Sequence, residues 1–245
     1  MTSPCSDVPV IAIDGPGGSG KGTVARAVAG RLGWHLLDSG ALYRLVGIAA
    51  LARNIALDDA PALAALAGSL DIRFEASGSP EGRVVLAGGD VTEEIRRETA
   101  GAAASRVAAI PAVRAALVIR QRGFRQPPGL VADGRDMGEA IFPDAALKVF
   151  LTAEVGERAR RRYNQLKQKG IDVSLPALSR DMAERDRRDA QRSVAPLRVC
   201  PGARVLDSTG VSVDDVVSQV LRWAAEALPE VAHRIGPSDT GCRPE

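Results

Sequence analysis

The chain has 245 residues, of which 45% are hydrophobic, 25% are charged and 3% are aromatic, and its formal net charge is +2. This composition predicts a globular protein with an aliphatic core, and the small charge does not by itself indicate a nucleic-acid-binding protein. No apolar stretch is long enough to span a membrane, and the N-terminus lacks the pattern of a signal peptide. The three cysteines form no metal-binding spacing, so we expect reduced thiols in a cytoplasmic protein.

Apolar runs alternate with amphipathic segments along the chain, which predicts an α/β fold with a parallel five-stranded sheet flanked by helices. Strands are expected at Val8–Ile13, Trp34–Leu37, 129–133, 146–151 and 203–207. Helices are expected at Gly20–Leu32, Ala41–Arg53, Asp59–Gly68, Thr92–Glu98, Gly101–Ala109, Ala112–Gln126, Glu154–Lys169, Leu175–Arg192 and Val213–Ala227. Between Leu70 and Asp90, two alternating segments joined by ASGSPEG predict an inserted antiparallel hairpin.

The segment GPGGSGKGT follows the first predicted strand and opens the first predicted helix, which is the context of a phosphate-binding loop. Backbone N–H groups and the helix N-terminus favour an anion there. Lys21 is expected to reach the β- and γ-phosphates of ATP, and Thr23 to offer its hydroxyl to Mg²⁺. The strict motif has Ser or Thr directly after the lysine, where this chain has Gly22. The residues of this loop, expected to bind the phosphates of a nucleotide, are Gly15, Pro16, Gly17, Gly18, Ser19, Gly20, Lys21, Gly22 and Thr23, and a family resemblance implies that the nucleotide is ATP.

The Gly-Lys-Gly-Thr variant of this loop is associated with nucleoside monophosphate kinases. A glycine-rich turn without a ligand is the structural alternative. A GTPase is not favoured, because the chain has no Asn-Lys-x-Asp signature.

The segment LLDSGALYR follows the second predicted strand and places Ser39 and Arg44 at the carboxyl end of the sheet, where ligands bind. The guanidinium of Arg44 suits a second phosphate group. A helix cap with a solvated arginine is the alternative reading of this segment.

The segment ADGRD ends the third predicted strand with Asp133, Arg135 and Asp136. At the end of a buried strand, two carboxylates beside an arginine cost free energy of folding unless another group pairs with them. Arg135 suits a phosphate, and a carboxylate suits an exocyclic amino group such as N4 of cytosine, while rejecting O4 of uracil. A turn held by a local Asp–Arg pair is the alternative.

Residues 154–192 carry eleven Lys or Arg and seven Asp or Glu. Arg158, Arg161 and Arg162 lie at helical spacing, and so do Arg185, Asp189 and Arg192. A solvated, salt-bridged helix is the usual meaning of such a run. Beside a phosphate loop, the same run predicts an arginine-rich lid that closes over two nucleotides, stabilises the transferred phosphoryl group and excludes water.

These four motifs, in this order, resemble the bacterial cytidylate kinases, which are P-loop nucleoside monophosphate kinases. The resemblance runs from about Val10 to about Ala227, through IDGPGGSGKGT, WHLLDSGALYR, LDIRF, GLVADGRDMG, FPDA, ERDRRD and VAPL. It implies transfer of the γ-phosphoryl group of ATP to CMP or dCMP with Mg²⁺, and the identity of the base rests mainly on this resemblance. It also implies that the hairpin belongs to an enlarged monophosphate-binding region.

The resemblance also implies a role for each matching residue. Ser39 and Asp189 would contact the acceptor's sugar. The acceptor's phosphate would be held by Arg44, Arg135 and Arg192, with Arg185 nearby. Cytosine would be read by Ser105, Arg114 and Asp136, with Asp133 close by. Lys21, Arg158, Arg162, Arg135 and Arg192 are the expected catalytic residues, and Thr23 is the expected metal ligand.

The same reading divides the chain into a P-loop core (8–38, 127–153 and 193–228), a CMP-binding region (39–126, with the antiparallel insertion at about 68–92), a lid (154–192) and a disordered tail (229–245). A monomer without nucleic-acid or membrane partners is expected. The alternatives are a P-loop kinase for another small acceptor, such as UMP or shikimate, and a nucleotide-dependent switch or nucleic-acid-associated ATPase.

Overall fold

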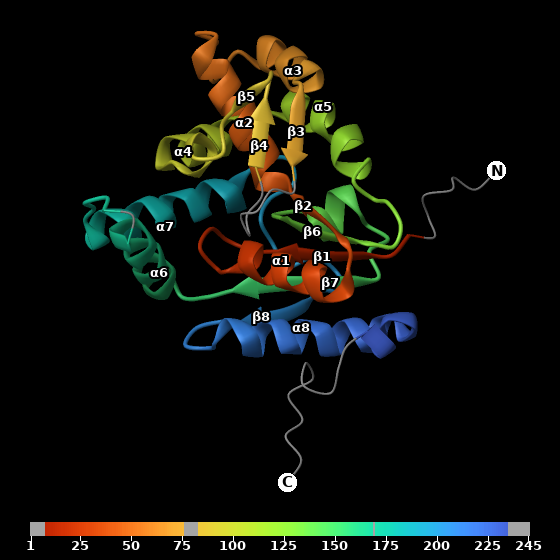
Figure 1. Ribbon diagram of the computed structural model, residues 1–245. Helices are drawn as coiled ribbons and strands as arrows, with labels where there is room; N and C mark the ends of the chain where they lie inside the picture. The colour runs from red at the N-terminus through yellow and green to blue at the C-terminus, as the bar shows by residue number, and fades with distance from the viewer. Residues whose placement is uncertain (1–7, 76–82, 169, 235–245) are drawn as a thin grey trace, which may run out of the picture. The chain divides into compact units, whose positions relative to one another are not determined.

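The computed structural model describes residues 8–75, 83–168 and 170–234 (Figure 1). Within them the chain forms two compact units. The first unit contains the residues up to Asp38 and those from Arg122 onward, and the second contains Ser39–Gln121. Each unit has its own sheet, so the two are described separately.

The first unit is built on a parallel five-stranded sheet in the order β2-β6-β1-β7-β8 (Figure 1). Its strands are β1 (Val10–Asp14), β2 (His35–Asp38), β6 (Leu130–Gly134), β7 (Leu147–Thr152) and β8 (Arg204–Asp207). Every residue of β1 and β6 is buried, as expected for central strands covered on both faces. Their register sets Asp14 beside Gly134 at the carboxyl edge. The predicted α/β fold with a five-stranded parallel sheet is confirmed.

Helices cover this sheet and complete the first unit. They are α1 (Lys21–Leu32), α6 (Val155–Gln168), α7 (Leu175–Gln191), α8 (Val213–Ala227), a π-helical turn η2 (Met137–Ile141) and a 3-10 helix η3 (Pro229–Arg234). Valines, leucines and alanines of α1 and α8 form one core with β1, β6 and β7. The predicted disordered tail therefore begins with ordered structure, since Val231 in η3 is buried, whereas residues 235–245 lie outside the described residues.

The second unit combines helices with a small antiparallel sheet in the order β3-β4-β5. Its elements are α2 (Ser39–Ala52), α3 (Ala60–Ser69), β3 (Ile72–Glu75), β4 (Arg83–Leu86), β5 (Gly89–Asp90), η1 (Glu94–Arg96), α4 (Glu98–Val107) and α5 (Pro111–Arg122). The predicted hairpin is present as β3 and β4, and β5 adds a third strand that the sequence did not predict. The ASGSPEG connection lies outside the described residues.

Two predicted helices of the second unit are shorter than expected. The predicted helix Thr92–Glu98 is only the 3-10 turn η1. Just before this turn, the N–H and Oγ1 of Thr92 donate to Asp90 Oδ1 at 2.9 and 2.6 Å, and Val84 N–H donates to Thr92 Oγ1 at 2.9 Å, so Thr92 is bonded to the antiparallel sheet. Helix α5 ends at Arg122 rather than Gln126, and Gln126 precedes Pro127, which disfavours helical geometry there.

Within the described ranges, no single helix is both long and apolar enough to cross a membrane. Helices α4 and α5, which meet at a bend of 105°, pass that test only as a pair, by length and composition.

Candidate active site

The phosphate-binding loop joins β1 to α1, as predicted. Its last residue, Gly20, has a left-handed backbone with φ of 90°, and α1 begins directly at Lys21. Lys21 is buried, and its ammonium donates to Pro16 O at 3.1 Å across the loop. Ser208 Oγ holds the loop from outside by donating to Ser19 O at 3.1 Å. The loop therefore encloses a cation and a helix N-terminus, which is the arrangement that binds phosphate.

A carboxylate from β6 lies against this loop. Asp133 Oδ1 is 4.0 Å from Lys21 Nζ, and both side chains are about one-tenth exposed. Burial lowers the pKa of Lys21 and raises the pKa of Asp133 from their ordinary values, because each charged form loses its water. The structure also explains why Gly22 replaces the Ser or Thr of the strict motif. A Cβ at Gly22 would lie 3.1 Å from Asp133 Oδ2, so the glycine makes room for the carboxylate.

The loop after β6 is fixed by Asp14, a residue that the sequence analysis did not single out. Its buried carboxylate accepts the N–H groups of Met137 and Gly138 at 2.8 and 2.9 Å. Arg135 and Asp136 lie in the segment that these bonds hold. Burying a carboxylate costs free energy unless it is hydrogen-bonded. The position of Asp14 at the end of a strand predicted to be buried could therefore have indicated that it has partners.

Arg135 forms an ion pair with Asp189 of α7, whose side chain is buried. Arg135 Nε donates to Asp189 Oδ2 at 3.1 Å, and Arg192 Nε donates to Asp189 O at 3.3 Å. Burial alone would raise the pKa of Asp189, but the guanidinium groups of Arg135, Arg192 and Arg185 hold it below its ordinary value. The first unit thus brings four predicted acceptor-site residues together.

This cluster of Arg135, Arg185, Asp189 and Arg192, the arginine cluster, lies near the phosphate loop. Positive charge on Arg135 and Arg185 contributes, after burial, to the lowered pKa of Lys21. A Cβ at Gly17 of the loop would lie 3.6 Å from Arg135 Nη2. This distance and the electrostatic effect on Lys21 place the arginine cluster beside the phosphate loop.

Arg158 of α6 is buried, although the sequence analysis placed it in a mobile lid. It donates to Ala153 O at 2.8 Å, to Gly17 O of the phosphate loop at 2.9 Å and to Asp186 at 2.5 Å. A Cβ at Gly18 would lie 2.6 Å from Met182 Cε of α7 and 3.2 Å from Arg158 Cβ, so both side chains lie against the phosphate loop. In this structure, therefore, Arg158 joins α6, α7 and the phosphate loop.

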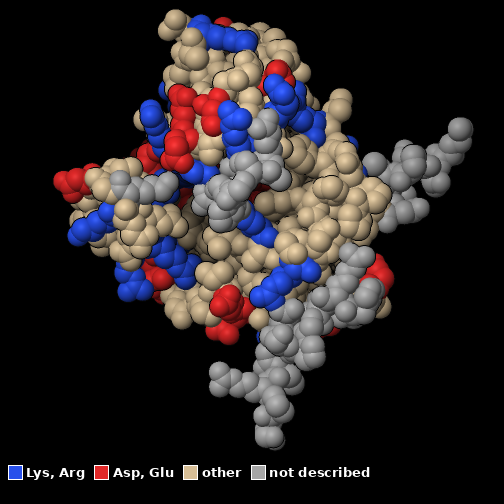
Figure 2. All heavy atoms as spheres, viewed as in Figure 1, with Lys and Arg blue, Asp and Glu red and all other residues tan. Residues whose placement is uncertain are grey.

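The other two arginines of this turn of α6 point elsewhere. Arg162 donates to Gln165 on the same helix at 3.3 Å. Arg161 donates to Ser208 Oγ at 3.1 Å and to Ser208 O at 2.5 Å. Because Ser208 also holds Ser19, Arg161 supports the loop through Ser208, a role that helical spacing alone could not predict. Basic and acidic side chains are intermixed over α6 and α7 rather than forming one basic field (Figure 2).

The second unit holds four more of the predicted acceptor-site residues, whereas Asp133 and Asp136 lie in the first unit. Arg44 Nη1 donates to Ile95 O at 3.1 Å. Arg114 is buried, lies 5.7 Å from the Tyr43 ring centroid and donates to Ala108 O at 3.4 Å. Ser105 is buried, and its hydroxyl has no hydrogen-bond partner among the described residues. Ser39 is buried at the start of α2.

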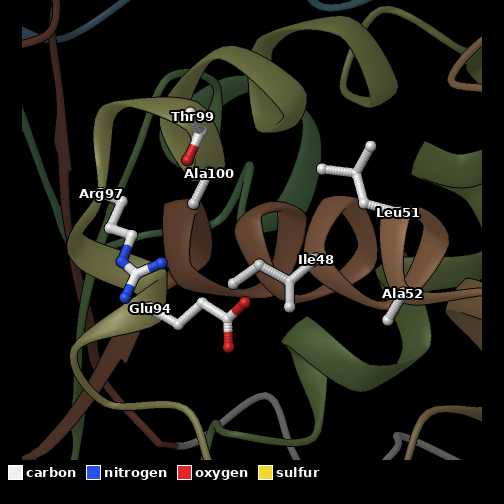
Figure 3. Close-up of a pocket in the computed structure, with 7 residues that line it drawn as sticks. All are labelled: Ile48, Leu51, Ala52, Glu94, Arg97, Thr99 and Ala100. Atoms are coloured by element: carbon white, nitrogen blue, oxygen red, sulfur yellow. The ribbon is translucent and has the colours of Figure 1, made fainter.

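A cavity of about 130 Å³ in the second unit is formed by other residues (Figure 3). Ile48, Leu51 and Ala52 of α2 line one side of it, and Glu94 and Arg97 lie on the other. Thr99 and Ala100 complete its lining. None of the predicted site residues lines this cavity, and its mostly apolar wall does not suit a phosphate.

A phosphate loop with a buried lysine, set between the first strand and first helix of a parallel sheet, defines a P-loop nucleotide-binding protein. The cytidylate kinase family model matches residues 11–226 of this chain. The chain therefore belongs to the cytidylate kinase family and is a kinase, an enzyme that transfers phosphoryl groups.

Individual relatives agree with the family model. A cytidylate kinase of Methylococcus capsulatus is 57% identical over 87% of this chain and 96% of that protein. A cytidylate kinase of Paraburkholderia phymatum is 56% identical over 94% of this chain and 98% of that protein. Among solved structures, TT1252 from Thermus thermophilus aligns over 90% of this chain and 98% of that chain, with 20% identity and a TM-score of 0.43.

Proposed function

We propose that this protein transfers the γ-phosphoryl group of ATP to CMP or dCMP, producing ADP and CDP or dCDP. One observation carries the proposal. The same unit holds a phosphate loop around Lys21 and, beside it, the arginine cluster, so two anionic groups have matched cationic sites. Membership of the cytidylate kinase family supports the choice of cytidine nucleotides as acceptors.

In the proposed reaction, an oxygen of the acceptor's phosphate attacks the γ-phosphorus as the bond to the β-phosphate oxygen breaks, leaving ADP. No general base is needed, because a phosphate monoester with a second pKa near ~6 is already anionic at neutral pH. The protein's contribution is positioning and electrostatic stabilisation. Lys21 would hold the triphosphate, while Arg135 and Arg192 would hold the acceptor's phosphate, with Arg185 nearby.

Mg²⁺ is the metal that this reaction would use, and the residues present fit it. Asp133 Oδ1 is buried without a hydrogen-bond partner among the described residues, and Mg²⁺ prefers oxygen ligands. No cluster of three or more His, Cys, Asp or Glu that could hold a metal occurs in those residues. Mg²⁺ would therefore be bound by the phosphates, by the Thr23 hydroxyl and by water, with Asp133 available nearby. Bound there, it would neutralise charge on the β- and γ-phosphates.

The remaining assignments follow the family and stay proposals. Asp136, Ser105 and Arg114 would read the cytosine ring, and Ser39 and Asp189 would contact the sugar. Arg44 would add a further cation for the acceptor's phosphate. Arg158 and Arg162 would serve the transferred group. For Arg158 that role requires it to leave Gly17 O or Asp186, both of which it contacts here. A monomeric cytoplasmic enzyme without membrane or nucleic-acid partners belongs to the same proposal.

The deciding experiment is a coupled assay of ADP formation with ATP, Mg²⁺ and one acceptor at a time. We expect turnover with CMP and dCMP, little with UMP and none with AMP. Lys21→Ala should abolish turnover while the far-UV circular dichroism spectrum stays unchanged. Asp136→Ala should reduce the preference for CMP over UMP. Equal kcat/KM for CMP and UMP in the wild-type protein would contradict the proposed specificity.

A further inference from the structure

Ser39 and Gln121 are hydrogen-bonded to each other inside the second unit, although they are 82 positions apart. Ser39 is the first residue of α2, and Gln121 lies in the last turn of α5. Ser39 Oγ donates to Gln121 Oε1 at 2.7 Å. Gln121 is fully buried and Ser39 is 3% exposed. The pair therefore joins the first and last residues of this unit of the fold.

Stability of the fold does not account for this buried glutamine. A side-chain amide inside a protein loses its water and needs partners for both its oxygen and its nitrogen. Gln121 Oε1 has Ser39, but Gln121 Nε2 has no hydrogen-bond partner among the described residues. Because an unmade buried hydrogen bond costs more than an average one contributes, an apolar side chain of similar shape would stabilise the unit at least as well.

The bond has a direct consequence for what Ser39 can bind. A serine hydroxyl has one hydrogen and two lone pairs. Gln121 takes the hydrogen, so the Ser39 oxygen is left with lone pairs, which accept hydrogen bonds from a donor. Burial of both side chains also keeps the hydroxyl in one orientation, because water cannot replace Gln121 as its partner.

We infer that Gln121 is a positioning residue that presents the Ser39 oxygen as a hydrogen-bond acceptor for a sugar hydroxyl of the acceptor nucleotide. The inference rests on the proposed function, which assigns Ser39 to that sugar. It adds a residue that does not touch the substrate and a direction for the bond, with the sugar hydroxyl as donor. A substrate oxygen without a hydrogen would then be disfavoured at this position.

The test compares Gln121→Leu, which removes the acceptor at similar volume, with Gln121→Glu, which keeps an oxygen in place. Q121L should raise KM for CMP about five- to tenfold with little change in kcat, since one hydrogen bond is lost in binding. Q121E should restore KM to within about twofold of the wild-type value. Gln126→Leu, the same substitution at an exposed glutamine, is the matched control and should leave both constants unchanged.

A double-mutant cycle separates positioning from a general structural effect. If Gln121 acts through Ser39, KM for CMP in S39A/Q121L should equal that in S39A, instead of being the product of the two single effects. Cytidine monophosphates that lack the 2′- or the 3′-hydroxyl locate the donor. Against the analogue that lacks the contacted hydroxyl, Q121L and wild type should show the same KM.

Each outcome bears on one conclusion. Wild-type KM in Q121L, or multiplicative effects in the double variant, overturns the inference while leaving the proposed function intact. Wild-type KM in S39A also overturns it. Absence of CMP phosphorylation by the wild-type protein contradicts the proposed function itself. If Q121L unfolds, Gln121→Met, which also removes the amide acceptor and has the unbranched shape of glutamine, replaces it in both the single-variant comparison and the double-mutant cycle.

Discussion

Replacing Asp14 with asparagine tests how a buried carboxylate supports the loop after β6. Asp14 is 5% exposed and accepts two backbone N–H groups, from Met137 and Gly138. Burial raises the pKa of Asp14 from its ordinary value of 3.8 to about 6, although both N–H bonds oppose the rise. The nearby charge of Asp136 adds to the rise, and that of Arg135 opposes it.

The sign of the pH effect follows from the direction of this shift. Between pH 3.8 and about 6, the unfolded chain has lost the Asp14 proton while the folded protein still holds it. The folded state therefore binds more protons, and its stability falls as the pH rises through this window. A shift of about two pKa units corresponds to about 3 kcal/mol of unfolding free energy. Asparagine does not titrate, so D14N should lack this contribution.

Urea unfolding of wild type and D14N from pH 4 to pH 7.5 measures the effect. The stability of wild type relative to D14N should fall by about 2.5 kcal/mol between pH 4 and pH 7, because the unfolded chain is already partly ionised at pH 4. Asp207→Asn is the matched control. Asp207 is exposed, and hydrogen bonds from Thr209 lower its pKa, so its contribution to stability changes only below about pH 4. The difference in stability between wild type and D207N should therefore stay nearly constant from pH 4 to pH 7.5. A difference between wild type and D14N that is constant over the whole range would refute the reasoning.

Two further variants test contacts of the phosphate loop. Arg158→Ala should destabilise the protein by about 3 kcal/mol, or roughly 6–12 °C in Tm measured by calorimetry, because it leaves Asp186 and two backbone carbonyls without their partner. Arg162→Ala on the same helix is the control and should change Tm by only about 1 °C. Equal changes of Tm in the two variants would contradict the role given to Arg158. Gly22→Ser restores the serine of the strict motif. It should nevertheless reduce kcat/KM about tenfold, because its Cβ would lie 3.1 Å from Asp133 Oδ2 and displace that carboxylate. Gly30→Ser on the same helix, where a Cβ meets nothing within 4 Å, should be fully active, and an active G22S would show that Asp133 yields readily.

The parallel sheet and the phosphate loop could be predicted because their signals are local. Continuous apolar runs such as Val10–Ile13 indicate strands buried on both faces. The phosphate loop consists of consecutive residues, and the helix that follows it begins at Lys21, one residue after the predicted start at Gly20. The helix predicted to begin at Thr92 could not be judged from its own residues, because Thr92 bonds to Val84 of β4 as well as to Asp90.

The arginines of α6 show the limit of pattern reasoning. Helical spacing placed Arg158, Arg161 and Arg162 on neighbouring positions but could not say which of them contacts the phosphate loop. Packing of α6 on α7 and on the loop buries Arg158, turns Arg161 to Ser208 and leaves Arg162 with Gln165. The direction of a charged side chain depends on the partners it finds across the fold.

The sequence by itself determined the strand-and-helix order, the phosphate loop and the resemblance to one kinase family, because each depends on residues close together in the chain. Only the tertiary structure decided the pairings of Asp14 with the loop after β6, Gly22 with Asp133, and Ser39 with Gln121. Those pairings join segments far apart in sequence. Each of these contacts is formed inside the protein, where water does not compete with it, and this environment exists only once the chain has folded.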